Sequence, residues 1–254
     1  MGTIAERIAT RYLPLWIDGA IRGRVRRDLV DLLRGMPEIA DAPVGLALRD
    51  AGLPVAGRSR LLQRLARRLR AAGLVADWRD EQSSLLDEAG REVARCERGV
   101  FRTLGIRNRA VHVNGFLPDG RIWVARRSER KRSDPGMLDN IAAGGVAAGE
   151  TLRQCAAREL WEEAGIPAWR ARRVQFPGMA ILSLREVRFG LHDEQVVVAD
   201  LELSSRFEPV GRDGEVAEFL CLAPADVGRR LDAGEFTIEA ALAMRDFMQR
   251  RIAR

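Results

Sequence analysis

The feature that most constrains this chain is an acidic helix near its middle, in the segment GGVAAGETLRQCAARELWEEAGI at residues 144–166. Residues 151–164 are expected to form a helix of nearly four turns. Glu159, Glu162 and Glu163 lie near its end at spacings i, i+3 and i+4, so they share one face. Because like charges repel at this spacing and the C-terminus of a helix carries partial negative charge, the arrangement costs free energy unless a cation offsets it.

The cation best suited to such a face is a divalent metal ion. Mg²⁺, and also Mn²⁺, prefers oxygen ligands, and its charge turns the repulsion between carboxylates into attraction. Mg²⁺ sites commonly combine few carboxylates with water and substrate phosphate, so the pattern predicts a site open to a diphosphate. The ordinary alternative is an acidic face that is simply solvated.

The segment and its spacing resemble the Nudix box, Gly-x5-Glu-x7-Arg-Glu-U-x-Glu-Glu-x-Gly-U, where U is aliphatic. Gly144, Glu150 and the run from Arg158 to Ile166 satisfy all nine specified positions, which outweighs the solvated-face alternative. The resemblance implies an α/β fold, a Nudix α/β/α sandwich built on a mixed sheet. It also implies Mg²⁺-dependent hydrolysis of a diphosphate linked to a second moiety, in which water attacks phosphorus.

The resemblance implies roles for individual groups. Those implied to hold the divalent ions are the carboxylates of Glu159, Glu162 and Glu163 and the backbone carbonyl of Gly144. Glu159 is also implied to orient or deprotonate the attacking water. Arg158 would steady the carboxylates, and Glu150 would support the ion cluster from the start of the helix. This chemistry is consistent, since metal ions neutralise phosphate oxygens and lower the pKa of bound water.

A further acid is expected on a loop outside the helix, in the segment VGRDGEVAEF at residues 210–219. Glu215 precedes a predicted strand and is the preferred general base or additional metal ligand. Asp213 and Glu218 are close to it in sequence. Asp213 precedes a glycine, so turn chemistry explains it without a functional role.

The first hundred residues differ in pattern from the rest. Leucines recur at helical spacing in RRDLVDLLRGM and RSRLLQRLARRLRAAGL, with arginines on the opposite face. Residues 1–105 are therefore predicted to be a mainly helical N-terminal extension, and residues 106–254 to be the Nudix domain. Capping of the substrate pocket, dimerisation and support of the sheet all stay open as roles for the extension.

Alternating apolar residues and turn signals predict the elements of residues 106–254. A hairpin with the turn LPDG is expected to join strands at 110–116 and 121–128. The other predicted strands are 137–145, 174–189, 194–203 and 215–223, and the predicted helices are 224–234 and 237–252. The segment LHDE, residues 191–194, is expected to be a turn between two strands.

Segments outside the box resemble one Nudix subgroup. HVNGF, WVARRSERKRSDPGMLDNIAAGG and DGEVAEF look like the group related to the N-terminal part of fungal thiamine pyrophosphokinase fusions, and GLVADWRDE with ERGVFRTLGI is similar to its N-terminal extension. This resemblance implies that thiamine diphosphate, or an oxidised analogue of it, is hydrolysed to the monophosphate and phosphate. A nucleoside-diphosphate or nucleotide-sugar hydrolase with the same metal site is the alternative.

The same resemblance implies four substrate-binding residues, namely Lys131, Arg132, Asp139 and Asn140. Lys131 is the single lysine of the chain, and a compact ammonium suits contact with a terminal phosphate. Loop solvation and strand-end hydrogen bonds are the plain alternatives for these residues. Trp123, Phe116 and Trp78 could stack on a heteroaromatic ring, although large aromatics more often fill a core.

Composition argues against several other classes. With three widely spaced cysteines, Cys96, Cys155 and Cys221, a disulfide framework is not expected. No apolar run approaches about 18 residues, so no membrane span is expected, and a cytoplasmic location fits best. His112 and His192 have no partner at metal or triad spacing, and His112 is expected to be a structural hydrogen-bonding residue.

Net charge bears on the partners. The formal charge of +6 is a weak indication of anionic ligands. A metabolite-sensing regulator that binds DNA through arginine-rich helices is an alternative of another class, but no helix-turn-helix signature accompanies those helices. The expected partner is a small-molecule diphosphate, nucleic acid is not expected, and a homodimer stays open.

Overall fold

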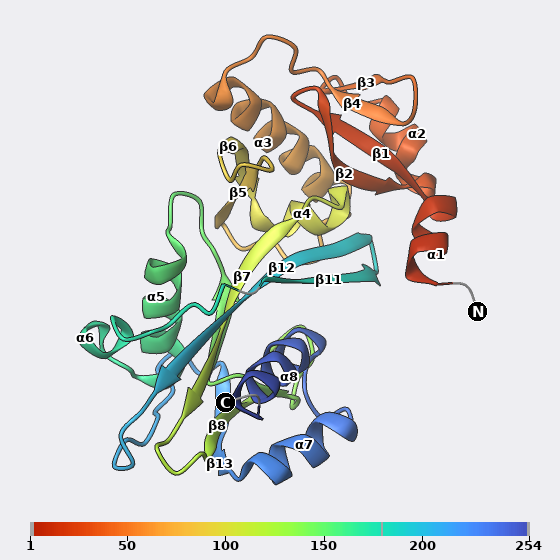
Figure 1. The fold of residues 1–254 in the computed structure, drawn as a ribbon. Coiled ribbons are helices and arrows are strands. Elements are labelled where there is room, and N and C mark those ends of the chain that lie inside the picture. The colour runs from red at the N-terminus through yellow and green to blue at the C-terminus, as the bar shows by residue number, and fades with distance from the viewer. Residues whose placement is uncertain (1–2, 179, 253–254) are drawn as a thin grey trace. The chain divides into compact units, whose positions relative to one another are not determined.

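The computed structural model describes residues 3–178 and 180–252, and the chain divides into two compact units. Unit 1 comprises Met1–Asn108, Ala147–Gly149 and Leu184–Glu194. Unit 2 comprises Arg109–Val146, Glu150–Ser183 and Gln195–Arg254. Figure 1 shows both units and labels most of their elements.

Unit 1 mixes short strands with helices. Its elements are α1 (Ile4–Arg11), β1 (Tyr12–Ile17), β2 (Ala20–Arg26), η1 (Arg27–Leu29), α2 (Val30–Arg34), β3 (Ile39–Asp41), β4 (Leu46–Leu48), α3 (Val55–Ala71), β5 (Gln82–Leu86), β6 (Glu92–Glu97) and α4 (Arg98–Leu104). One sheet has the order β2-β1-β4-β3, in which β1 and β4 are parallel and the other pairs antiparallel. β5 and β6 form a separate antiparallel pair.

The prediction of a mainly helical extension is wrong in this respect. The two leucine-rich segments do form α2 and α3, but strands occupy much of the remaining chain. A signal for the first hairpin was available, because Asp18 and Gly19 lie between two apolar runs and both adopt positive φ, as a two-residue turn requires. In β2, arginines interrupt the apolar positions and shorten the alternation of apolar and polar residues. This strand was missed because the short pattern that remains resembles one face of a helix.

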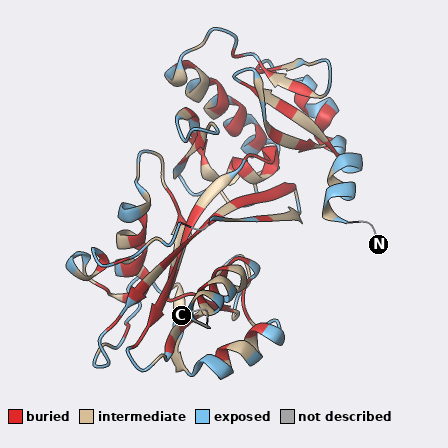
Figure 2. Ribbon diagram, viewed as in Figure 1, coloured by how far each residue is buried: buried red, intermediate tan, exposed pale blue. Residues whose placement is uncertain are grey.

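The core of unit 1 is built on α3. Leu61, Leu62, Leu65 and Leu69 on one face of this helix are buried. Burial of each leucine side chain contributes about 1.5–3 kcal/mol. The opposite face is exposed and carries arginines, as the alternating colours along α3 in Figure 2 show. Helix α3 is therefore amphipathic, as its leucine spacing predicted.

Unit 2 is organised around one sheet. Its elements are β7 (Asn108–Phe116), β8 (Ile122–Arg127), β9 (Leu138–Asp139), β10 (Ala142–Gly145), α5 (Leu152–Ala164), α6 (Ala168–Ala171), β11 (Ala180–Val187), β12 (Gly190–Glu202), β13 (Val216–Leu222), α7 (Pro224–Asp232) and α8 (Ile238–Ile252). The sheet order is β11-β12-β7-β8-β13, with β10 beside β7 and β9 beside β8. The connecting ends of β11 and β12 belong to unit 1.

Alternate side chains of the sheet face two different cores, which makes unit 2 a layered sandwich. Val113 and Trp123 pack in a cluster that contains Leu160 of α5. Val124 packs in a second cluster that contains Phe247 of α8. Helices therefore cover both faces of the sheet, and the predicted α/β sandwich is confirmed.

Three local predictions need correction. LHDE, residues 191–194, is not a turn but part of β12, and the turn lies at residues 188–189. Its polar residues are buried and paired, as when Asp193 accepts a hydrogen bond of 2.7 Å from Arg107 Nε. The predicted strand at 137–145 is divided into β9 and β10, and the one predicted at 174–189 begins at Ala180, with residue 179 outside the described residues. The error at residues 191–194 arose because polar side chains that form tertiary hydrogen bonds within a strand were interpreted as turn residues.

Helix α5 is fixed by local chemistry at both ends. The Thr151 side chain accepts a hydrogen bond from the backbone N–H of Gln154, whose own side chain accepts one from the Thr151 N–H. The helix ends at Gly165, which adopts a left-handed φ of 66°. The predicted helix at 151–164 is confirmed. Among the described residues, every helix is too short or too polar to cross a membrane.

Candidate functional site

The acidic face of α5 is buried against the segment that carries β10. Glu159 and Glu163 are 8% and 6% exposed, whereas the Glu162 side chain is 44% exposed. The backbone N–H of Ala143 donates to Glu163 Oε2 at 2.8 Å. A Cβ atom at Gly144 would overlap the Glu159 carboxylate, so only glycine allows this approach. The two buried carboxylates and the strand that faces them were both indicated by the box spacing.

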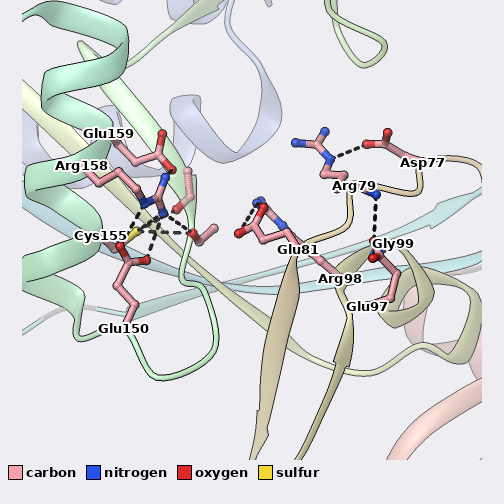
Figure 3. Close-up of polar contacts among 12 residues, drawn as sticks. Asp77, Arg79, Glu81, Glu97, Arg98, Gly99, Glu150, Cys155, Arg158 and Glu159 are labelled. Carbon is pink, nitrogen blue, oxygen red and sulfur yellow. Dashed lines mark hydrogen bonds and ion pairs between the residues drawn. The ribbon is translucent and has the colours of Figure 1, made fainter. Parts of the chain in front are cut away.

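Arg158 connects the box carboxylates to one another. Its Nε and Nη2 donate to the two oxygens of Glu150, each at 3.0 Å. Its Nη1 donates to Glu159 Oε1 at 2.5 Å (Figure 3). The same Nη1 lies 3.3 Å from Glu162 Oε2. Hydrogen bonding to Glu150 raises the pKa of Arg158 further above its usual range. The guanidinium therefore holds three acids in fixed positions.

Glu163 has an environment that opposes its negative charge. Burial, followed by repulsion from Glu159, raises the pKa of Glu163 to about 8. The ammonium of Lys131 acts in the opposite direction, with Nζ at 3.7 Å from Glu163 Oε1. A second positive charge beside this carboxylate would favour its ionised form.

A loop brings further acids to the end of α5. The N–H of Val210 donates to the carbonyl of Ala164 at 3.1 Å, and the N–H of Arg212 donates to the carbonyl of Glu162 at 2.9 Å. These bonds satisfy carbonyls that the helix leaves unpaired at its C-terminus. One carboxylate oxygen from each of Glu163, Asp213 and Glu215 lies within 4.8 Å of the other two.

Asp213 is the residue that sequence reasoning undervalued. Its Oδ1 accepts a hydrogen bond of 2.8 Å from the N–H of Glu215, so the predicted turn role is real. The same carboxylate also belongs to the group formed by Glu163 and Glu215. Burial raises the pKa of Asp213. Its position two residues before Glu215 was the available signal. Glu218, the other nearby acid, accepts instead from Arg126 Nε at 2.5 Å.

Lys131 lies among the acids. Its ammonium forms ion pairs with Glu215 and with Glu163. Arg132 is exposed on the same loop. A single lysine thus contacts an α5 carboxylate and a carboxylate of the 210–215 loop, which places a positive charge between them.

Asp139 on β9 and the neighbouring Asn140 are both buried, at 7% and 0% exposed. Asp139 accepts from Arg127 Nη1 at 2.8 Å and from the Asn140 N–H at 2.9 Å. The Asn140 side chain is fully buried, with Oδ1 at 2.8 Å from His112 Nδ1, and it donates to Asn114 Oδ1 at 2.7 Å. Both polar atoms of this amide, Oδ1 and Nδ2, therefore have partners within the protein. The geometry favours a positioning role for Asn140 over contact with a substrate.

The three candidate stacking aromatics have protein partners. Trp123 packs against the core that contains α5, and Phe116 lies 5.4 Å from the ring of Phe247. In unit 1, the Trp78 ring is covered by the guanidinium of Arg70 at 4.4 Å. The core role that was the plain alternative accounts for these contacts.

The donor set of the acid cluster fits a divalent cation. Three carboxylates converge within 4.8 Å, and three further acids are held by Arg158. Such oxygens are the ligands that Mg²⁺ and Mn²⁺ prefer. Lys131 supplies one positive charge there, while burial and repulsion from Glu159 raise the pKa of Glu163 and so oppose its ionised form.

Comparisons with known proteins agree with this geometry. A family model described as NUDIX domain matches residues 106–241. The chain is 32% identical over 159 residues to "Nudix hydrolase 24, chloroplastic" of Arabidopsis thaliana, which covers 61% of this chain and 43% of that protein. It is 29% identical over 212 residues to the uncharacterized protein YJR142W of Saccharomyces cerevisiae, which covers 76% and 62%. The chain thus spans less than two thirds of the length of these relatives.

Two further comparisons concern bacterial proteins. The uncharacterized Nudix hydrolase YfcD of Escherichia coli is 30% identical over 174 residues, which covers 68% of this chain and 88% of that protein. The crystal structure of DR0079 from Deinococcus radiodurans aligns with a TM-score of 0.49 and 23% identity, and covers 67% of this chain and 98% of that chain.

Proposed function

The chain belongs to the NUDIX domain family, and from this premise we propose that it hydrolyses the diphosphate of an organic compound with Mg²⁺ or Mn²⁺. The observation that carries the proposal is the convergence of Glu163, Asp213 and Glu215 beside the acids organised by Arg158. A simply solvated acidic face does not account for Glu159 and Glu163, because both are buried and burial penalises their charges.

The metal-holding groups of the proposal are Glu159, Glu162 and Glu163 with the carbonyl of Gly144, joined by Asp213 or Glu215. A bound divalent ion would neutralise phosphate oxygens and lower the pKa of a bound water. Glu215 is the preferred base, because its carboxylate is 43% exposed and can accept the proton of the attacking water. Glu159 is the other candidate base.

In the reaction, a water oxygen forms a bond to phosphorus while the bridging phosphoanhydride oxygen leaves with the bond electrons. The products are a monophosphate and inorganic phosphate. Lys131 would exchange a carboxylate partner for a phosphate oxygen, since a metal ion would then neutralise the acids that it pairs with. Arg132 and Asp139 remain proposed contacts at this end of the site.

For the substrate, we propose thiamine diphosphate or an oxidised analogue. The support is the resemblance of the flanking segments, from HVNGF through DGEVAEF, to one subgroup. The yeast relative matches 76% of the chain, which is more than residues 106–254 contain, so part of the N-terminal region also has a counterpart. The division at residue 105, a cytoplasmic location and a homodimer belong to the same proposal.

A substrate panel tests the proposal. Thiamine diphosphate, its oxidised analogues, ADP-ribose and nucleoside diphosphates and triphosphates are each incubated with Mg²⁺ and with EDTA, and phosphate release is measured. We expect Mg²⁺-dependent release that is fastest with a thiamine-type diphosphate. Faster turnover of ADP-ribose or nucleotides would reject the substrate while keeping the chemistry. The absence of turnover for every diphosphate would reject the hydrolase.

A further inference from the structure

Unit 1 contains a cavity of about 170 Å³ whose lining residues are separate from those of the acid cluster. Helix α4, the segment that precedes β5 and the turn between β11 and β12 form its walls. Ile106, Val187 and Phe189 contribute apolar surface, and Arg98 and Arg102 contribute positive charge. Every lining residue belongs to unit 1.

Most charges of the lining are paired. Arg79 Nε donates to Asp77 at 2.6 Å, and Arg98 Nη1 lies 3.2 Å from Glu81 (Figure 3). Asp193 likewise pairs with Arg107 outside the lining, at 2.7 Å. In each pair the opposite charges offset one another. Arg102, Arg188 and Glu194 are the charged lining residues outside these pairs.

Arg102 is hydrogen-bonded to a histidine instead of a carboxylate. Its Nε donates to Nδ1 of His192 at 3.1 Å, and in the part of the chain that the structure describes its terminal nitrogens have no hydrogen-bond acceptor. The other ring nitrogen of His192, Nε2, lies 3.6 Å from Oε1 of Glu194, a buried acid of the same lining. Glu194 attracts the guanidinium, but Arg185, Arg98 and Arg79 repel it. Burial lowers the pKa of Arg102, which reflects the loss of solvation.

The guanidinium of Arg102 is half-buried, and its two terminal nitrogens have no acceptor among the described residues, so they can bind an anion that enters the cavity. Its planar fork matches the two oxygens of a carboxylate or phosphate. The size of the cavity limits the rest of the molecule, since a cavity of about 150 Å³ holds benzene. A whole nucleotide would not fit.

From these observations we propose that the unit 1 cavity binds a small organic anion, whose carboxylate or phosphate pairs with Arg102 and whose apolar body packs against Ile106, Val187 and Phe189. This assigns the N-terminal region a ligand site of its own. The site is independent of the proposed hydrolysis, because none of its residues belongs to the acid cluster.

The test uses the full chain in EDTA, so that no divalent ion recruits phosphate to the acid cluster. Benzoate and inorganic phosphate are titrated separately by calorimetry, and thermal unfolding is followed at each concentration. We expect saturable one-site binding of at least one of these anions and a matching rise in Tm. Benzoate alone would identify a carboxylate ligand, and phosphate alone would identify a phosphate ligand.

Two variants and one control locate the binding. Arg102→Gln is expected to weaken binding about tenfold or more, Arg102→Lys to weaken it less because the charge remains, and Arg67→Gln, an exposed arginine on α3, to leave it unchanged. Arg102→Lys keeps the test decisive if Arg102→Gln does not fold. The proposal is overturned if neither anion saturates the wild-type protein, or if the Arg102 variants bind as the wild type does.

Discussion

Helices α3 and α5 each carry a row of like charges, yet the two rows are held in different ways. The arginines of α3, such as Arg60 and Arg67, project into solvent, where water screens their repulsion. The acids Glu159 and Glu163 of α5 are buried and are organised by Arg158 and Lys131. The comparison teaches that a charged stripe indicates a site only when the fold removes it from water and supplies cations to it.

The largest expected effect comes from neutralising the buried row. Glu163→Gln should reduce Mg²⁺-dependent phosphate release by more than about 100-fold, since even residues behind a metal ligand change activity by about 10–100-fold. The matched control is Glu208→Gln, an exposed acid that should retain wild-type turnover. Circular dichroism checks folding, and phosphate release measures the rate. Wild-type turnover in Glu163→Gln would contradict the assignment of the α5 acids.

A second, smaller effect concerns the cation that organises the row. Arg158→Lys keeps the charge but loses the two-oxygen contact with Glu150, so phosphate release should fall by about 10–100-fold. Calorimetric titration with Mn²⁺ should show weaker metal binding in the same variant. If turnover and Mn²⁺ affinity are both unchanged, Arg158 does not position the carboxylates.

The third effect is a pH dependence that only the buried row should produce. The pKa of Glu163 is raised to about 8 in the metal-free fold, so between its unfolded value and that pH the folded state binds more protons than the unfolded state. Stability therefore falls as pH rises through this interval. Thermal unfolding in EDTA should give a lower Tm at about pH 9 than at about pH 5.

Glu163→Gln is the matched variant for this measurement, and it should flatten the decline because the titrating carboxyl is gone. Excess Mg²⁺ should do the same in the wild type, since a bound cation favours the ionised carboxylate. An equal decline in the wild type and in Glu163→Gln would assign the pH dependence to other groups.

The smallest effect is expected on the solvated row. Arg67→Gln on α3 should change the free energy of unfolding by no more than about 0.5 kcal/mol, because the side chain is exposed. Denaturant unfolding measures this difference, and phosphate release should be unchanged. A loss of stability comparable to a core substitution would show that the two rows do not differ as the exposures indicate.

Much of unit 2 could be predicted because its signals are local. The capping residue Thr151, the stop at Gly165 and the spacing of the acids are all contained in one segment. The hairpin of β7 and β8 is equally local, with a short turn between alternating apolar strands. Unit 1 was less predictable, because β1 pairs with β4 across a separation of some thirty residues that no local pattern encodes.

The errors at 191–194 and at Asp213 have one physical cause. Polar residues at 191–194 resembled a turn until tertiary contacts, such as that between Asp193 and Arg107, satisfied them within a strand. Asp213 resembled an ordinary turn residue until the loop was held against α5 by backbone hydrogen bonds. The partner of a polar group lies far away in sequence, so its environment cannot be read from its neighbours along the chain.

The sequence by itself determined the box helix, its acidic face and the need for a cation, because helix geometry and charge repulsion act over a few residues. Tertiary structure alone decided that Lys131 and Asp213 join that face, and that Arg102 borders a cavity. The physical reason is burial, since the energy of a charge depends on how much water is removed and which distant groups replace it.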